Sequence, residues 1–162
     1  MKLRIWLLCC IAVFSTDLCA AITVRDDAGA TLTLARPAQR VISLAPDQTE
    51  LLFAAGGAQH VVGVIRFSDY PEAATRLPVV GDVQGLDLER ILSLKPDLIV
   101  VWGGGNATQQ LLQLRKTGIA LFVSQPRHLA AKDLFRRLKT LLSGQGSGAH
   151  TRLADLRPRA AA

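Results

Sequence analysis

Four short apolar runs alternate with helix-forming segments along this chain, and that alternation restricts its fold more than any other feature. The runs cover residues 41–44, 61–65, 98–102 and 119–123 and contain almost no polar side chain. Strands that are apolar on both faces are typical of a parallel sheet covered by helices on each side. We therefore expect an α/β fold, a single Rossmann-like lobe whose ligands bind at the carboxyl ends of the strands.

The predicted helices are marked by their starts. Asp47 with Glu50 three residues later reads as a capping box, and Asp87 and Asn106 are further candidate caps. The helix after Asn106 has Leu112 among its apolar positions, and an amphipathic helix is expected over residues 129–142. A β-hairpin with strands at 22–25 and 31–34 should precede the sheet, because apolar alternation flanks a turn sequence there.

The N-terminal segment has the pattern of a cleavable secretory signal peptide. Lys2 and Arg4 precede an apolar run over residues 5–14, and small residues allow cleavage after Ala21. A transmembrane anchor is the alternative, but a spanning helix needs about 20 apolar residues. The sequence therefore predicts a signal peptide at 1–21 and a periplasmic product.

The cysteines all lie inside that leader. They are Cys9, Cys10 and Cys19, and none follows the small residue that lipid modification requires. After cleavage the chain would hold no disulfide, thiol nucleophile or thiolate metal site, so its stability would come from its core.

The positive charge is concentrated at one end. The chain carries a formal charge of +6, yet residues 22–126 hold nine basic and ten acidic side chains. Residues 127–162 hold eight basic and two acidic ones, with Phe135 as their only aromatic residue. A solvated basic helix face fits this pattern better than a nucleic-acid platform, which needs interleaved aromatic residues. We expect no nucleic acid among the partners.

No catalytic or metal-binding pattern is present in the sequence. His60, His128 and His150 lack the spacing of metal ligands, and the glycines at 103–105 are not followed by the Lys-Ser or Lys-Thr of a phosphate loop. The chain is therefore expected to be no enzyme, with no catalytic residue, no metal and no cofactor.

Four blocks in order carry a resemblance to a known family: Arg40-Val-Ile-Ser-Leu-Ala-Pro46, Thr49-Glu-Leu-Leu52, Asp87-Leu-Glu-Arg-Ile91 and Leu94-Lys-Pro-Asp-Leu98. They resemble the helical-backbone family of ABC-importer binding proteins, which take up cobalamin, haem and ferric siderophores. The resemblance covers about residues 22–142 and implies an N-terminal lobe. Its members have two lobes joined by a long helix, with the transported ligand clamped between them.

Two further blocks, Phe67 to Pro71 and Trp102 to Asn106, are most similar to the members that bind cobalamin. The resemblance implies that Trp102 and Phe67 line the corrinoid, and that Val83 occupies a third lining position where a tryptophan is usual. Rigid aromatic rings suit a large flat ligand, and the three consecutive glycines Gly103, Gly104 and Gly105 leave room for it to approach the backbone. Each aromatic residue has a simpler interpretation as a packing residue of its strand end or loop.

Glu89 matches the carboxylate with which this lobe docks on an arginine of the membrane permease in that family. Without the resemblance, an acidic residue in the first turn of a helix needs no partner, because it favours the positive end of the helix dipole. The implied partners are thus cobalamin or a related corrinoid and the permease of an ABC importer.

One alternative concerns the transported ligand, and another concerns the functional class of the protein. Val83 favours haem or a ferric siderophore as ligand, and the fold also permits a ligand-free interaction or accessory module. Residues 143–162 are expected to be a flexible segment and the possible stub of the inter-lobe helix, so that the C-terminal lobe would be absent and the product truncated. A single lobe would bind corrinoid weakly, because half of the clamp is missing.

Overall fold

The sheet at the centre of the molecule is parallel and four-stranded, as predicted. A computed structural model describes residues 21–82, 84–105, 108–125 and 131–144. The sheet order is β4–β3–β5–β6, so the chain starts near the centre, crosses to one edge and returns to the other. Its members are β3 (Val41–Ser43), β4 (Val61–Val64), β5 (Leu98–Trp102) and β6 (Ala120–Ser124). All described pairings between these strands are parallel.

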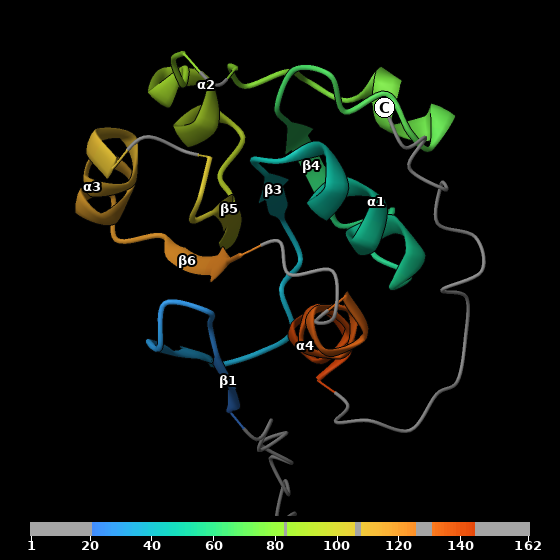
Figure 1. The fold of residues 1–162 in the computed structure, drawn as a ribbon, viewed down its shortest axis with the longest axis vertical. Helices are drawn as coiled ribbons and strands as arrows, with labels where there is room; N and C mark the ends of the chain where they lie inside the picture. The colour runs from blue at the N-terminus through green and yellow to red at the C-terminus, as the bar shows by residue number, and fades with distance from the viewer. Residues whose placement is uncertain (1–20, 83, 106–107, 126–130, 145–162) are drawn as a thin grey trace, which may run out of the picture.

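Helices cover both faces of the sheet (Figure 1). Helices α1 (Pro46–Ala54) and α4 (Ala131–Ser143) pack on one face, and α2 (Leu88–Ser93) and α3 (Thr108–Lys116) pack on the other. A short 3-10 helix, η1 (Glu72–Arg76), follows β4 and was not expected from the sequence. This three-layer arrangement is the α/β lobe predicted above.

Strand β5 shows why its sequence is apolar throughout. Leu98 and Val100 join the core under α1 and α4, whereas Ile99 and Val101 join the core under α2 and α3. All four are buried, because successive side chains of a strand point to opposite faces and both faces are covered.

The predicted hairpin is confirmed and forms a separate two-stranded sheet. Strands β1 (Ile22–Arg25) and β2 (Thr31–Leu34) pair antiparallel, and Gly29 takes the positive φ of 83° that the turn requires. Ile22 and Val24 point into the same core as α4, which gives the hairpin its packing partner.

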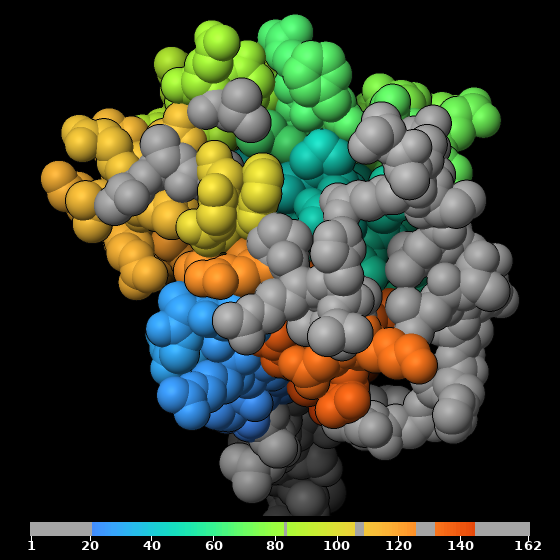
Figure 2. Space-filling model, in the orientation of Figure 1, coloured from blue at the N-terminus to red at the C-terminus, as the bar shows by residue number. Residues whose placement is uncertain are grey.

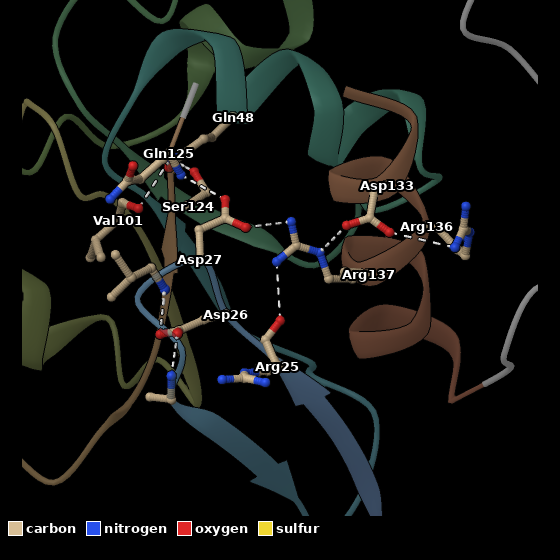
Figure 3. A network of polar contacts seen from close by, with 12 residues as sticks. Arg25, Asp26, Asp27, Gln48, Val101, Ser124, Gln125, Asp133, Arg136 and Arg137 are labelled. Atoms are coloured by element: carbon tan, nitrogen blue, oxygen red, sulfur yellow. Dashed lines mark hydrogen bonds and ion pairs between the residues drawn. The ribbon is translucent and has the colours of Figure 1, made fainter. Parts of the chain in front are cut away.

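Polar contacts fix the turn of the hairpin to the end of β6 and to α4 (Figure 3). The main-chain N–H of Asp27 donates to the carbonyl of Val123 at 2.9 Å, and its carboxylate accepts from the N–H of Gln125 at 2.7 Å. Arg137 of α4 approaches the same carboxylate at 2.7 Å and also donates to the carbonyl of Arg25 at 3.0 Å. The hairpin is thereby attached to the lobe by directional bonds as well as by apolar contact.

One of the predicted helix caps is confirmed and another is wrong. Asp87 caps α2, since its side chain accepts from the N–H of Arg90 at 2.9 Å. Asp47 does not cap α1: the helix starts with Pro46 at its first position, and Ala45 is the N-cap without a side-chain bond. Proline at that position is favoured because its fixed φ suits a helix start and its missing N–H has no acceptor there.

Leu112 was expected on the apolar face of α3, but its side chain is 54% exposed. Leu114 of the same helix is buried instead. Residues 1–20 of the predicted leader, the predicted cap Asn106 and residues 145–162 lie outside the described residues. Within the described part of the chain, no helix has the length and apolar character to cross a membrane.

Candidate functional site

The carboxyl ends of the four strands meet at one edge of the sheet, where open α/β sheets bind their ligands. The segment that follows each strand either contains a candidate binding residue or contacts a segment that does. In Figure 2 the yellow segment that ends β5 lies beside the turquoise start of α1, with green residues next to them on the same face. We call this region the carboxyl edge and define it by residues 43–49, 65–68, 101–105 and 124–125.

Phe67 is the most exposed large apolar side chain among the described residues, at 76%. It stands in the tight turn after β4, where the N–H of Ser68 donates to the carbonyl of Ile65 at 3.3 Å. Its φ of 67° is unfavourable for a residue with a side chain. An aromatic ring held in water by a strained backbone packs nothing inside the lobe, so the simpler interpretation of Phe67 as a packing residue is wrong. Such outliers are typical of functional positions.

Trp102 lies at the end of β5 and is partly buried. The N–H of Gly103 donates to the carbonyl of Ser124 at 2.8 Å, which ties this strand end to β6. The indole turns back over the following glycines, and a Cβ at Gly105 would overlap its ring. The expectation that all three glycines leave space for a ligand is therefore wrong at Gly105, where the chain's own tryptophan takes the space.

Gly104 is exposed and Gly103 is partly exposed. A Cβ at Gly104 would approach the indole nitrogen of Trp102 at 3.2 Å, and one at Gly103 would approach Val123 at 2.9 Å. Both glycines thus serve the packing of the turn. Their approach to a ligand stays a prediction.

Val83 lies outside the described residues, but its flanking residues show where its loop is attached. The carboxylate of Asp82 accepts from the N–H groups of Gln84 and Gly85 at 2.9 and 3.1 Å. The N–H of Arg66, which directly precedes Phe67, donates to the carbonyl of Gly81 at 2.9 Å. The loop is therefore anchored beside the Phe67 turn.

Glu89 is exposed in the first turn of α2, where the sequence placed it. It forms no ion pair with any residue in the described ranges. Leu92, one turn further along the same short helix, is also half-exposed. Glu89 and Leu92 belong to the helical layer and lie outside the residues that define the carboxyl edge.

A buried polar cluster supports the carboxyl edge and was missed in the sequence. Gln48, in the first turn of α1, is 1% exposed and donates from Nε2 to the carbonyl of Val101 at 3.1 Å and to the hydroxyl of Ser124. Thr49, the next residue, is fully buried, and its hydroxyl lies 3.2 Å from that of Ser68. Polar residues at a helix start are usually solvated, so their type and position gave no sign of this burial.

The described residues contain no group of three His, Cys, Asp or Glu side chains that could hold a metal ion. The carboxyl edge instead offers aromatic rings, glycine backbone and a few buried amide and hydroxyl groups. This combination of apolar contact area and few polar groups is typical of sites that bind organic molecules by shape.

Comparison with known proteins gives one family and a consistent group of relatives. A family model described as periplasmic binding protein matches residues 41–149. The vitamin B12-binding protein of Yersinia pestis (strain Pestoides F) is 52% identical over 106 residues, which are 64% of this chain and 38% of the relative. The chain therefore spans much less than half the length of this curated relative.

Solved structures resemble the lobe at similar coverage. The periplasmic vitamin B12-binding protein BtuF of Vibrio cholerae matches with a TM-score of 0.64 and 40% identity, covering 67% of this chain and 43% of that one. The periplasmic heme-binding protein RhuT from Roseiflexus sp. RS-1 matches with a TM-score of 0.56 and 34% identity, covering 62% and 39%. The α/β lobe predicted from the sequence is thus a fold that these binding proteins share.

Proposed function

The chain belongs to the periplasmic binding protein family, and we propose that it forms the ligand-contacting N-terminal lobe of the substrate-binding component of an ABC importer for cobalamin or a related corrinoid. In this role the lobe makes and breaks no covalent bond. Its relatives are binding proteins, which agrees with the lack of a catalytic pattern in the sequence.

The observation that carries the proposal is the 52% identity to a vitamin B12-binding protein over 106 residues of the chain. The heme-binding structure reported above is less similar, at 34% identity. Haem is accordingly the second candidate ligand, and Val83 is the residue that favours it, since it replaces an aromatic lining residue of cobalamin binders.

The carboxyl edge fits a large flat ligand. Phe67 follows β4 and Trp102 ends β5, and these two strands flank β3 in the sheet. The start of α1 after β3 therefore lies between the two aromatic residues. Rings on both sides of a helix start offer a wide, rigid contact area at low entropic cost, which suits the apolar faces of a corrin.

The leader supports export of the lobe to the periplasm. The hairpin strand β1 begins at Ile22, directly after the predicted cleavage position at Ala21, so cleavage there removes no described strand. Mass spectrometry of the protein isolated from the periplasm of a host bacterium tests this proposal. A mature chain that starts at Ile22 supports it, and an unprocessed chain starting at Met1 contradicts it.

Glu89 supports a separate proposal for the permease contact. An exposed carboxylate without a described partner can accept a bidentate bond from an arginine of another protein. Glu89→Gln should weaken binding of the lobe to the permease in detergent and leave corrinoid binding unchanged. Glu72→Gln is the matched control, because Glu72 is also exposed and already pairs with Arg76.

Calorimetric titration with three ligands tests the cargo. Cyanocobalamin, haemin and a ferric siderophore are titrated separately into the purified chain and into variants Phe67→Ala and Trp102→Ala. Heat from cyanocobalamin alone, reduced in both variants, supports the proposal. Leu112→Ala is the control for loss of an exposed apolar side chain away from the carboxyl edge.

Two results would contradict the proposal. Saturable binding of haemin without any corrinoid binding would assign the lobe to the second candidate ligand. Corrinoid binding that both aromatic variants leave unchanged would place the ligand elsewhere on the lobe.

A further inference from the structure

The first turn of α1 contacts both turns that carry the aromatic residues. Gln48 and Thr49 are adjacent in sequence, but their side chains reach in different directions. Gln48 reaches the ends of β5 and β6, whereas Thr49 reaches the turn after β4. We propose that these two buried residues are positioning residues, which fix Trp102 and Phe67 relative to each other and so set the contact surface for the ligand.

The contacts of Gln48 fix the backbone on which Trp102 is mounted. Its Nε2 donates to the carbonyl of Val101, the peptide group before Trp102. The peptide group after Trp102 is held by the N–H of Gly103, which donates to the carbonyl of Ser124 at 2.8 Å. Gln48 also donates to the hydroxyl of Ser124. Both peptide groups around Trp102 are thus anchored, and the direction of its side chain follows.

Stability alone is a poor explanation for Gln48. Its Oε1 is buried and finds no hydrogen-bond partner among the described residues. A buried acceptor without a partner costs free energy, and this cost offsets part of what the two bonds from Nε2 contribute to stability. If Oε1 and Nε2 of Gln48 exchanged places, Oε1 would face the carbonyl oxygen of Val101 and repel it. The bond from Nε2 to that carbonyl therefore fixes the orientation of the Gln48 amide. The main effect of Gln48 is therefore to fix the position of the carboxyl end of β5.

Thr49 fixes the backbone of the turn that contains Phe67. Its hydroxyl lies 2.9 Å from that of Ser43 and 3.2 Å from that of Ser68, and all three side chains are buried. Ser68 directly follows Phe67 in the turn. A chain of hydroxyl groups therefore connects the strained turn to the end of β3 and the start of α1, and such connected groups hold a site rigidly.

The proposal deepens the proposed function, and its first test needs no ligand. The sequence has two tryptophans, Trp6 and Trp102, so Trp6→Phe leaves Trp102 as the only reporter. A second reporter chain carries Trp6→Phe, Trp102→Phe and Phe67→Trp. Gln48→Met and Thr49→Val are introduced into each, and the emission maximum, acrylamide quenching and anisotropy decay of the single tryptophan are measured.

We expect each variant to change only one of the two reporters, a pattern that we call the crossed result. Gln48→Met should shift the emission of the reporter at 102 and raise its quenching, while the reporter at 67 keeps its values. Thr49→Val should do the reverse, and Thr49→Ser, which keeps the hydroxyl, should restore the reporter at 67. Two matched controls lie outside the carboxyl edge: Gln39→Met, which removes a similar bond to a backbone carbonyl, and Thr117→Val, which removes a local hydroxyl bond. Both controls should leave both reporters unchanged.

Two outcomes would overturn the proposal: unchanged reporters in folded variants, or equal changes in both reporters for either variant. The second outcome describes general loosening and not positioning. If Gln48→Met or Thr49→Val does not fold by circular dichroism, Ser124→Ala and Ser68→Ala remove the far partners of the same bonds with less change in volume, and the same crossed result is required of them.

The ligand experiment comes second and separates the two proposals. If the chain binds cyanocobalamin, Gln48→Met and Thr49→Val should each weaken binding roughly fivefold, the size of one lost hydrogen bond. Unchanged affinity in both variants would overturn the positioning role in binding. A chain that binds no cyanocobalamin but shows the crossed reporter result retains the positioning role and refutes only the proposed cargo.

Discussion

Arg137 Nη2 lies 2.7 Å from Asp27 Oδ1, and this ion pair joins helix α4 to the turn of the N-terminal hairpin. The guanidinium also stacks over Phe122 of β6, with its Cζ 5.3 Å from the ring centroid. Three elements that are distant in sequence thus meet at one arginine, and Figure 3 shows its contacts with the hairpin turn. Its side chain is 15% exposed and that of Asp27 is 23% exposed, so the pair is better shielded from water than the other ion pairs among the described residues.

Arg137→Ala is expected to lower the free energy of unfolding by about 2 kcal/mol, because it leaves the half-buried Asp27 carboxylate with fewer partners. Urea unfolding followed by circular dichroism measures the change. The neighbouring Arg136 is the control: it pairs with Asp133 at a 58% exposed position, and Arg136→Ala should cost about 0.5 kcal/mol or less. Equal losses for the two variants would show that the contact with Asp27 adds nothing.

Phe67 should tolerate glycine better than alanine. Its φ of 67° lies in the left-handed region, which costs about 1–2 kcal/mol for a residue with a Cβ and nothing for glycine. We therefore expect Phe67→Gly to unfold at higher urea concentration than Phe67→Ala. At Leu112, which is also exposed but lies in a helix, the order should reverse by about 1 kcal/mol. The same order at both positions would contradict the backbone strain assigned to Phe67.

Gly105→Ala should displace the indole of Trp102, since a Cβ there overlaps the ring. The expected cost is about 1–3 kcal/mol, typical of overpacking, with a change in Trp102 fluorescence in the Trp6→Phe chain. Gly85→Ala is the control, because nothing lies within 4 Å of a Cβ at that position. Unchanged fluorescence and stability in Gly105→Ala would mean that the indole does not lie over this glycine in solution.

Asp87→Ala should lower the free energy of unfolding by about 1 kcal/mol, because it removes the cap on the N–H of Arg90. Asp87→Asn should recover most of that loss, since asparagine caps nearly as well. Urea unfolding of the three proteins checks the order, and a serine variant provides a second replacement cap. Equal stability of the alanine and asparagine variants would contradict the capping role.

The elements of this lobe were predictable from sequence because their signals are local. The apolar runs, the turn at Gly29 and the cap at Asp87 each depend on residues within a few positions of one another. Asp47 was misassigned because Pro46 starts α1 earlier and displaces the expected cap. Leu112 was placed in the core because spacing along a helix does not define how wide its buried face is.

The site was only partly predictable, because its support depends on contacts between distant residues. Trp102 and Phe67 were recognised by their place after strands, but a positive φ at a phenylalanine has no sequence signature. Gln48 reaches Ser124 across 76 positions of the chain, and no local pattern reports such a contact. Even the glycines after Trp102 gave a misleading indication, since Gly105 accommodates the protein's own ring.

The most direct test of the account is a fluorescence titration of the Trp6→Phe chain with cyanocobalamin, in which Trp102 is the only tryptophan. A corrin bound against the carboxyl edge accepts excitation energy from a nearby indole, so we predict saturable quenching that Phe67→Ala weakens and that Leu112→Ala leaves unchanged. Quenching that rises without saturation, as from free corrinoid in solution, would contradict a corrinoid site at Trp102.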